Sequence, residues 1–248
     1  NVYNAYHCWL SRQFAIEYSS LFDAVLPALM RLGVPVPLGG TSNHFPRHVL
    51  QEIGAWDPYN VTEDADLGVR LARRGWTTAV IESTTWEEAP VTLGVWFRQR
   101  TRWMKGWMQT YLVHTRHPWR LWRELGFGGT IGFHALTGGL ILSALVHPVF
   151  CATLLIGGTD WLLTAPAVDE ASDWTIALWW IAWINLLFGY VASILLGVVA
   201  LIQRRAWWLL PATLAMPLYW LLISAAAYRA VYQFAIDPFR WEKTPHGQ

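Results

Sequence analysis

Apolar positions in the first third of the chain recur with the spacing of helices. Over 6–32 they return every three or four residues until Gly33 and the prolines behind it interrupt the pattern. Residues 63–74 show the same period and end at Gly75, so both stretches are predicted to be helical. Residues 76–82 alternate loosely between apolar and polar side chains, which is typical of a strand. The pattern predicts mixed α and β structure for this part of the chain.

Three long apolar stretches dominate the second half of the chain. The first two, about 130–156 and 176–202, contain no Asp, Glu, Lys or Arg. Each exceeds the about 20 residues that a helix needs to cross a hydrocarbon core of about 30 Å, so we expect transmembrane helices rather than buried helices of a soluble core. The third stretch, about 206–228, contains Pro211 and Pro217, which disfavour an unbroken helix. This stretch is expected either to span the membrane or to be re-entrant.

The overall composition supports a membrane protein and argues against other classes. Of the 248 residues 54% are hydrophobic and 14% are charged, which excludes an intrinsically disordered chain. The formal net charge is +1, so no global basic field points to a nucleic-acid partner. The two cysteines, Cys8 and Cys151, form neither a disulfide framework nor a CxxC metal signature.

Charge is distributed unevenly around the apolar stretches, and this predicts their orientation. Residues 97–128 hold seven Lys and Arg against one acid, whereas 157–174 hold four acids and no Lys or Arg. Because cytoplasmic loops carry the excess of Lys and Arg, the first half is predicted to be cytoplasmic and 157–174 to lie outside. A cytoplasmic tail over 237–248 follows if 206–228 does not span, and this is the preferred arrangement.

Thr62-Glu63-Asp64 opens the predicted helix at 63–74 and has two interpretations. The structural one makes Thr62 the N-cap and places the acids in the first turn, where the helix dipole favours them. The chemical one uses a carboxylate, ionised at neutral pH, to accept a proton. Asp64 and Asp66 have the D-x-D spacing of a metal–nucleotide site. On a helix, however, side chains at i and i+2 point about 200° apart, so no metal site is predicted in this chain.

A glycine pair lies within a second polar segment, residues 39–45. The pair allows a tight turn or a close approach of the backbone to a ligand. Asn43 and His44, which follow it, are able to hydrogen-bond a polar substrate. A plain turn explains the glycines equally well.

Residues 96–107 mix tryptophans with cations and are the strongest local signal. This mixture is typical of an amphipathic helix at a membrane surface. The same segment also supplies an amide at Gln99 for hydroxyl groups, a guanidinium at Arg102 for a diphosphate, and an indole face at Trp103 for a sugar ring. Both membrane anchoring and sugar-nucleotide binding remain open on these residues alone.

The two strongest motifs together resemble a known family. Thr62-Glu63-Asp64, followed about 35 residues later by Gln99-Arg100-Thr101-Arg102-Trp103, resembles the TED and Q(Q/R)xRW motifs of processive family-2 glycosyltransferases. These include cellulose, hyaluronan, chitin and poly-N-acetylglucosamine synthases. Residues 39–45 and 237–247 look like a bacterial exopolysaccharide-type branch of that family. The resemblance covers nearly the whole chain and implies the C-terminal part of a GT-A enzyme.

The resemblance implies a role for each motif residue. Asp64 is expected to be the general base, with Glu63 orienting or binding nearby. Lys243 and Thr244 are possible members of a gating loop, with a membrane-surface anchor as the alternative for this tail. The residues expected to bind substrate are Thr62, Asn43, His44, Gln99, Arg100, Arg102 and Trp103, among which Trp103 is expected to stack on the acceptor sugar.

The fold class expected is therefore α/β plus transmembrane α. Residues 1–92 are expected to form the acceptor-side part of a GT-A domain, 93–125 an interfacial region, 126–236 the membrane region and 237–248 the tail. In the family the nucleotide-binding strands and a metal-binding DxD precede the TED motif, and the residues before Thr62 offer neither. Mg²⁺ or Mn²⁺ is expected only in the full-length enzyme, and the isolated chain is expected to be inactive.

The function expected is membrane-bound, inverting transfer of a sugar from a nucleoside-diphosphate sugar to a growing polysaccharide. The enzyme is expected in the bacterial inner membrane as a multi-pass protein, with the lipid bilayer as a partner and without nucleic acid. One alternative is a non-processive transferase acting on a lipid-linked acceptor, or glycolipid. Another is a non-catalytic transporter or scaffold, although the apolar stretches lack the buried charges that transport would require.

Overall fold

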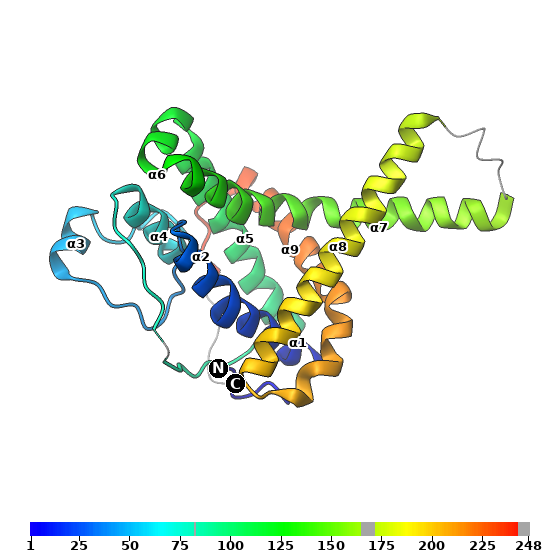
Figure 1. The fold of residues 1–248 in the computed structure, drawn as a ribbon, viewed down its shortest axis with the longest axis horizontal. Helices are drawn as coiled ribbons and strands as arrows, with labels where there is room; N and C mark the ends of the chain where they lie inside the picture. The colour runs from blue at the N-terminus through cyan, green and yellow to red at the C-terminus, as the bar shows by residue number, and fades with distance from the viewer. Residues whose placement is uncertain (82, 165–171, 243–248) are drawn as a thin grey trace.

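The computed structural model describes residues 1–81, 83–164 and 172–242, and its regular structure there is helical (Figure 1). Figure 1 shows the second part of α7 and the first part of α8 projecting from the rest of the chain. The helices are α1 (Trp9–Ser19), α2 (Leu26–Leu32), α3 (Arg47–Glu52), α4 (Glu63–Arg73), α5 (Leu93–Thr115), α6 (Pro118–Phe133), α7 (Gly139–Thr164), α8 (Asp173–Gln203) and α9 (Met216–Ile236), with π-helical turns η1 (Ser20–Val25) and η2 (His134–Gly138) and a 3₁₀ segment η4 (Trp207–Ala215).

The helix predicted over 6–32 is confirmed as α1, η1 and α2, which follow one another without a break. Cys8 caps its start, because the Cys8 side chain accepts a bond from the Ser11 backbone while the Ser11 hydroxyl accepts one from the Cys8 backbone. Gly33 ends it in the left-handed conformation, at φ +65°, which glycine adopts without a steric penalty.

The prediction of a strand over 76–82 is wrong for 76–81, the residues of this segment that the structure describes. Residues 76–81 are irregular, and the described chain contains one isolated parallel bridge, between Val2 and Glu87, but no strand. A strand needs a neighbour for its backbone N–H and C=O groups, and Val80 N donates to Met30 Sδ instead, at 3.1 Å. Mixed α/β structure is therefore not confirmed.

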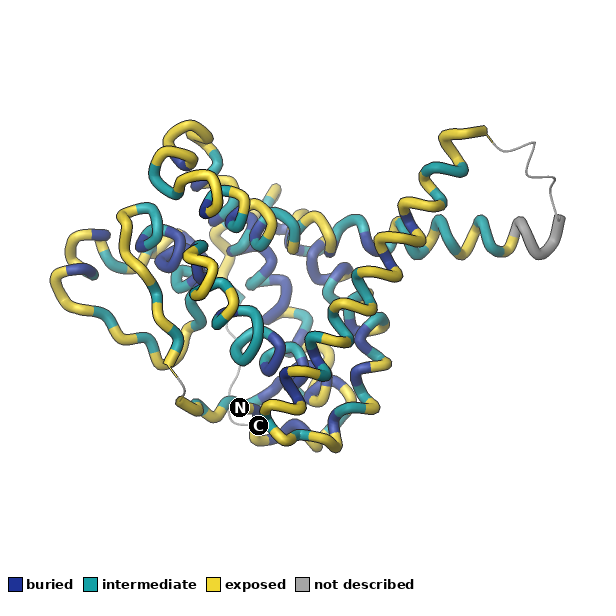
Figure 2. Tube along the Cα trace, in the orientation of Figure 1, coloured by how far each residue is buried: buried dark blue, intermediate teal, exposed yellow. Residues whose placement is uncertain are grey.

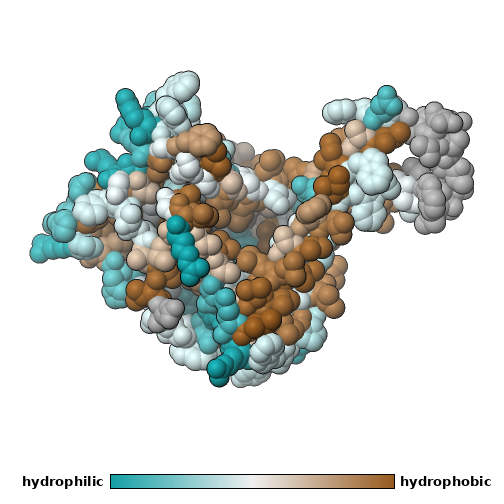
Figure 3. Space-filling model, in the orientation of Figure 1, coloured by the Kyte–Doolittle hydropathy of each residue, from teal (hydrophilic) through white to brown (hydrophobic). Residues whose placement is uncertain are grey.

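All three apolar stretches are helical, with bounds that differ from those expected. Pro118–Thr159, Asp173–Gln203 and Trp207–Ile236 are each long and apolar enough to cross a membrane. Pro211 lies in η4, and Pro217 lies in the first turn of α9, where a missing N–H costs little. The prolines thus mark a change of helix type without ending the stretch. Figure 3 shows hydrophobic surface over α8 and hydrophilic surface around α3.

The centre of the molecule is formed by α1, α5, α9 and the end of α8. Phe14, Ile16, Trp96 and Tyr219 are at most 2% exposed and belong to one apolar cluster (Figure 2). A second cluster joins Met104 and Met108 of α5 to alanines of α9. Helix α5, which carries the Gln99–Trp103 motif, is consequently packed against the last helix of the chain along much of its length.

Candidate functional site

Asp64 lies in the first turn of α4, beside the glycine pair predicted to turn tightly. Thr62 occupies the N-cap position as expected, but its side chain makes no capping bond and its hydroxyl donates to Asn60 Oδ1, at 3.4 Å. The Trp56 indole N–H donates to Asp64 Oδ1 at 3.1 Å. A Cβ placed on Gly40 would lie 2.9 Å from Asp64 Oδ2, so the absence of a side chain there lets the turn approach the carboxylate.

The surroundings of Asp64 make its carboxylate a better proton acceptor than an ordinary one. Burial raises its pKa most strongly, and the charge of Glu63 raises it further. The hydrogen bond from Trp56 and the charge of Arg102 lower it, but the net pKa remains above the usual value. A carboxylate tuned in this way suits general-base work.

The bond from Trp56 gives a testable pH dependence. In the full-length glycosyltransferase that the sequence resemblance implies, Trp56→Phe removes a donor that stabilises ionised Asp64, so the pKa of Asp64 rises further. The acid limb of the kcat/KM profile for sugar transfer is then expected to move to higher pH. Trp76→Phe is the matched control, because that exposed indole lies edge-on to His48 and makes no bond to Asp64. An unshifted acid limb in Trp56→Phe would contradict the assignment.

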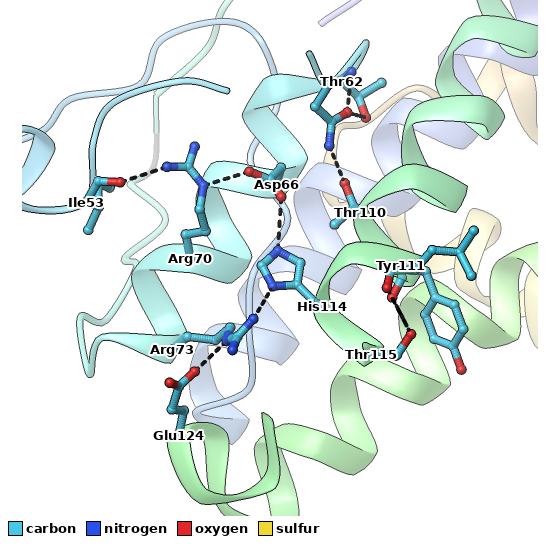
Figure 4. Close-up of polar contacts among 12 residues, drawn as sticks. Ile53, Thr62, Asp66, Arg70, Arg73, Thr110, Tyr111, His114, Thr115 and Glu124 are labelled. Carbon is cyan, nitrogen blue, oxygen red and sulfur yellow. Dashed lines mark hydrogen bonds and ion pairs between the residues drawn. The ribbon is translucent and has the colours of Figure 1, made fainter. Parts of the chain in front are cut away.

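Asp66 lies on the other side of α4 and has a structural environment (Figure 4). Its Oδ1 is 3.0 Å from His114 Nε2 and its Oδ2 accepts from Arg70 Nε at 2.6 Å. Burial alone would raise the pKa of Asp66, but His114 and Arg70 outweigh it and the pKa is lowered. Asp64 and Asp66 therefore do not converge, as the helical spacing predicted. Within the described ranges no three His, Cys, Asp or Glu side chains gather where a metal ion could bind.

The same polar network continues from Asp66 to α6. His114 Nδ1 lies 2.7 Å from Arg73 Nη1, and Arg73 Nε donates to Glu124 Oε2 at 2.6 Å (Figure 4). Helices α4, α5 and α6 are thus joined through side chains that are mostly buried. This network holds α4, the helix that carries Asp64 in its first turn.

The start of α4 packs directly against α5, and this contact brings the two motifs together. Val61 N donates to Gln109 Oε1 at 3.1 Å, and Asn60 Nδ2 donates to Thr110 Oγ1 at 2.9 Å. Gly106 leaves the space that Thr62 fills. Sequence reasoning missed these positioning residues. The available signal was the small and polar side chains that follow the motif at helical spacing, where an anchoring helix would carry apolar ones.

Gly106→Ala is expected to destabilise the chain. The added Cβ would meet Thr62 Oγ1 at 2.1 Å and Thr62 Cγ2 at 2.6 Å, so the two helices must separate. Overpacking costs about 1–3 kcal/mol, which exceeds the about 1 kcal/mol that alanine gains over glycine in a helix. Gly94→Ala on the same helix has only Arg98 within 4 Å and should be neutral or stabilising. Thermal unfolding in detergent compares the two; equal melting temperatures would refute the packing argument.

Gln99, Arg100 and Arg102 of the Gln99–Trp103 motif each carry at least one buried polar atom without a hydrogen-bond partner among the residues that the structure describes. Gln99 Oε1 and Arg102 Nε make no bond within the described parts of the chain. Arg102 is close enough to Glu63 and Asp64 for their charges to raise its pKa, although burial dominates and lowers it. Since unpaired buried polar groups are rare, these atoms are suited to receive the hydroxyl or phosphate groups of a ligand.

Arg100 and Trp103 face a different environment. Arg100 forms an ion pair of 2.5 Å with Glu17, and its guanidinium carbon lies 4.5 Å from the Trp103 ring centroid and 5.0 Å from that of Phe14. Trp103 also stacks on Tyr18, at 6.2 Å. In this structure both side chains contact the protein core. Substrate binding by Arg100 and sugar stacking by Trp103 stay predictions.

The remaining predicted site residues are dispersed. Asn43 donates its side-chain amide to Gly39 O within its own turn, and His44 is exposed. Lys243 and Thr244, the possible gating residues, lie outside the described residues. The tail residues before them, Asp237–Glu242, contact α5. Lys105 Nζ donates to the backbone carbonyls of Asp237 and Arg240. Gln109 Nε2 donates to Pro238 O at 2.8 Å.

Several known proteins are similar in sequence to this chain. β-Monoglucosyldiacylglycerol synthase of Synechocystis sp. is 26% identical over 85% of this chain and 42% of its own length. Probable glycosyltransferase YdaM of Bacillus subtilis is 37% identical over 27% of the chain and 16% of its own. Poly-β-1,6-N-acetyl-D-glucosamine synthase of Staphylococcus aureus is 29% identical over 37% and 22%.

The chain spans less than half of the length of each of these relatives. No solved structure gives a significant match. The family described as "Glycosyl transferase family group 2" matches residues 2–236, which is nearly the whole chain. The chain belongs to this glycosyltransferase family.

Proposed function

We propose that this chain is the acceptor-side and membrane part of an inverting glycosyltransferase that adds a sugar from a nucleoside-diphosphate sugar to a growing polysaccharide. The observation that carries the proposal is the contact of α4 with α5, which puts Asp64, a carboxylate with raised pKa, near Arg102. The family match supports sugar transfer as the reaction class. It disfavours a non-catalytic transporter or scaffold.

The proposed reaction is a single displacement. Asp64 accepts the proton of an acceptor hydroxyl while the hydroxyl oxygen bonds to the anomeric carbon of the donor sugar and the bond to the diphosphate breaks. Arg102 stabilises the negative charge that develops on the leaving diphosphate. Gln99 accepts a hydroxyl bond with its unpaired carbonyl oxygen. Glu63, Thr62 and Trp103 complete the proposed acceptor site.

The divalent cation expected with the donor does not fit the residues described. Asp64 and Asp66 point to different sides of α4, and no alternative cluster of ligands is present in the described ranges. No step above is therefore routed through Mg²⁺ or Mn²⁺. We propose that their site, and the donor-binding part, belong to the full-length enzyme. On this basis the isolated chain should release no UDP from UDP-sugars with either cation; measurable release would overturn this part of the proposal.

A glycolipid acceptor is the second candidate. The relative that matches 85% of this chain is named as a β-monoglucosyldiacylglycerol synthase, whereas the poly-β-1,6-N-acetyl-D-glucosamine synthase matches 37%. We place the enzyme in a bacterial inner membrane with α4 on the cytoplasmic side, where nucleotide sugars and lipid acceptors both have access.

Product analysis of the full-length enzyme tests the proposed function. The purified enzyme is incubated with radiolabelled UDP-glucose or UDP-N-acetylglucosamine and Mg²⁺, and the label is separated into polymer, organic-soluble glycolipid and free sugar. Label in polymer supports the polysaccharide proposal. Label in an organic-soluble product selects the glycolipid candidate. Transfer to neither acceptor from any nucleotide sugar tested would remove the enzymatic proposal.

A further inference from the structure

Cationic and aromatic side chains lie exposed between α5 and α6 and along the first half of α6. They are Arg116, His117, Trp119, Arg120, Trp122 and Arg123, which together we name the α6 surface. Trp119 is 81% exposed and Trp122 49% exposed, and their rings meet edge-on at 6.4 Å. Leu121 is fully buried in a cluster with Val69 and Phe133, which fixes this part of α6 to the rest of the protein. The two tryptophans point away from that cluster into the exposed surface.

The α6 surface carries excess positive charge. Glu124 is its nearest acid, and it is shared between Arg120 at 2.7 Å and Arg73 at 2.6 Å. Arg116 and Arg123 have no ion-pair partner in the part of the chain that the structure describes. A shallow hollow of about 450 Å³ is lined by His117, Trp119, Arg120 and Arg123, together with Pro118. Planar guanidinium groups around such a hollow match the geometry of a phosphate group.

The position of the α6 surface along the chain puts it at the level of lipid headgroups. No Asp, Glu, Lys or Arg occurs between Leu125 and Thr159, and the apolar run Pro118–Thr159 is long enough to cross a membrane. Gly126, at φ +67°, breaks the helix just behind the arginines, so the α6 surface is set at an angle to the apolar run that follows. Figure 1 shows α6 near the first residues of α7, far from the end of α7 that projects from the rest of the chain. Tryptophan and arginine are the residues that anchor proteins at this level.

We propose that the α6 surface binds the phosphate of an anionic phospholipid, with Trp119 and Trp122 inserted beside the headgroup. The contact is connected to the catalytic helix through Glu124 and Arg73, which link α6 to His114 and Asp66. Lipid binding thus holds the start of α4 at a fixed height above the bilayer. The proposal is independent of which sugar or acceptor the enzyme uses.

Lipid binding to the full-length protein tests the proposal. The protein in neutral detergent is titrated with phosphatidylglycerol or phosphatidylcholine, and bound lipid is counted by native mass spectrometry. The Arg116→Gln/Arg123→Gln variant removes two exposed charges and should bind phosphatidylglycerol about thirtyfold more weakly. Arg12→Gln/Arg47→Gln is the matched control, since both side chains are exposed and their helices, α1 and α3, are not among those that pack against α6.

Each outcome of this experiment either supports or overturns the lipid proposal. Selective loss of phosphatidylglycerol binding in the Arg116→Gln/Arg123→Gln variant, with wild-type binding in the control, supports an anionic lipid site. The proposal is overturned if both variants bind phosphatidylglycerol equally well. It is also overturned if the wild-type protein binds phosphatidylcholine as tightly as phosphatidylglycerol. Displacement of phosphatidylglycerol by millimolar inorganic phosphate would assign the hollow to a soluble phosphate and would likewise overturn the lipid proposal.

Discussion

Asp64→Asn in the full-length enzyme is expected to lower the rate of sugar transfer by about a hundredfold to ten-thousandfold, the range that a general base contributes. Asparagine keeps the size of the side chain and its oxygen still accepts the bond from Trp56, so the fold should persist. It is unable to take the acceptor proton. The wild-type kcat/KM should fall as the pH drops through the raised pKa of Asp64, at a higher pH than an ordinary carboxylate would give.

The control for this variant is Glu52→Gln, which removes an exposed carboxylate at the end of α3. It should transfer sugar at the wild-type rate. Equal melting temperatures of both variants and the wild type would show that any loss is catalytic. Sustained polymer or glycolipid synthesis by Asp64→Asn would remove Asp64 from the role of base.

Arg100→Met is expected to lower the free energy of unfolding by about 3 kcal/mol. Arg100 is almost completely buried among Phe14, Trp96 and Trp103, and removing one partner of a buried ion pair leaves the other charge without compensation. Because Glu17 is 32% exposed, the effect should fall at the lower end of the range of about 3–5 kcal/mol for such pairs. Chemical unfolding of the detergent-solubilised protein measures the loss.

The double variant Glu17→Gln/Arg100→Met distinguishes charge from packing. If the uncompensated carboxylate causes the loss, the double variant should be more stable than Arg100→Met alone. If the loss comes from packing around the guanidinium, the second substitution should restore nothing. A wild-type unfolding curve for Arg100→Met would show that the ion pair contributes no stability.

Local sequence patterns predicted the helix that carries Asp64. The helix period over 63–74 and Gly75 behind it match α4, and the 200° separation of Asp64 from Asp66 explains their different environments. The glycine pair at 39–40 is predicted to allow a tight turn or a close approach to a ligand, and in the structure Gly40 lies against the Asp64 carboxylate. These features depend on residues near in sequence, whose geometry is set by helix and turn stereochemistry.

Long-range partners could not be predicted in the same way. The alternation over 76–82 suggested a strand, but a strand is formed only when another one pairs with it, and none does so in the described chain. The cations of 96–107 suggested a membrane-surface helix. Arg100 instead meets Glu17, 83 positions earlier, and Trp96 bonds to Tyr219, 123 positions later. Nothing in the local pattern of α5 identifies these partners.

The packing of α5 against α9 has a consequence for biosynthesis. Trp96 donates to the hydroxyl of Tyr219 at 3.0 Å, and Met104 and Met108 are buried by Ala227 and Ala230. A ribosome adds residues at about 5–20 per second, so α5 emerges roughly 6–25 seconds before α9 is complete. During that interval the Gln99–Trp103 motif has an uncovered apolar face. Chains truncated before α9 should therefore be recognised by chaperones and proteases as unfinished, and the candidate site is assembled only once the last helix has been made.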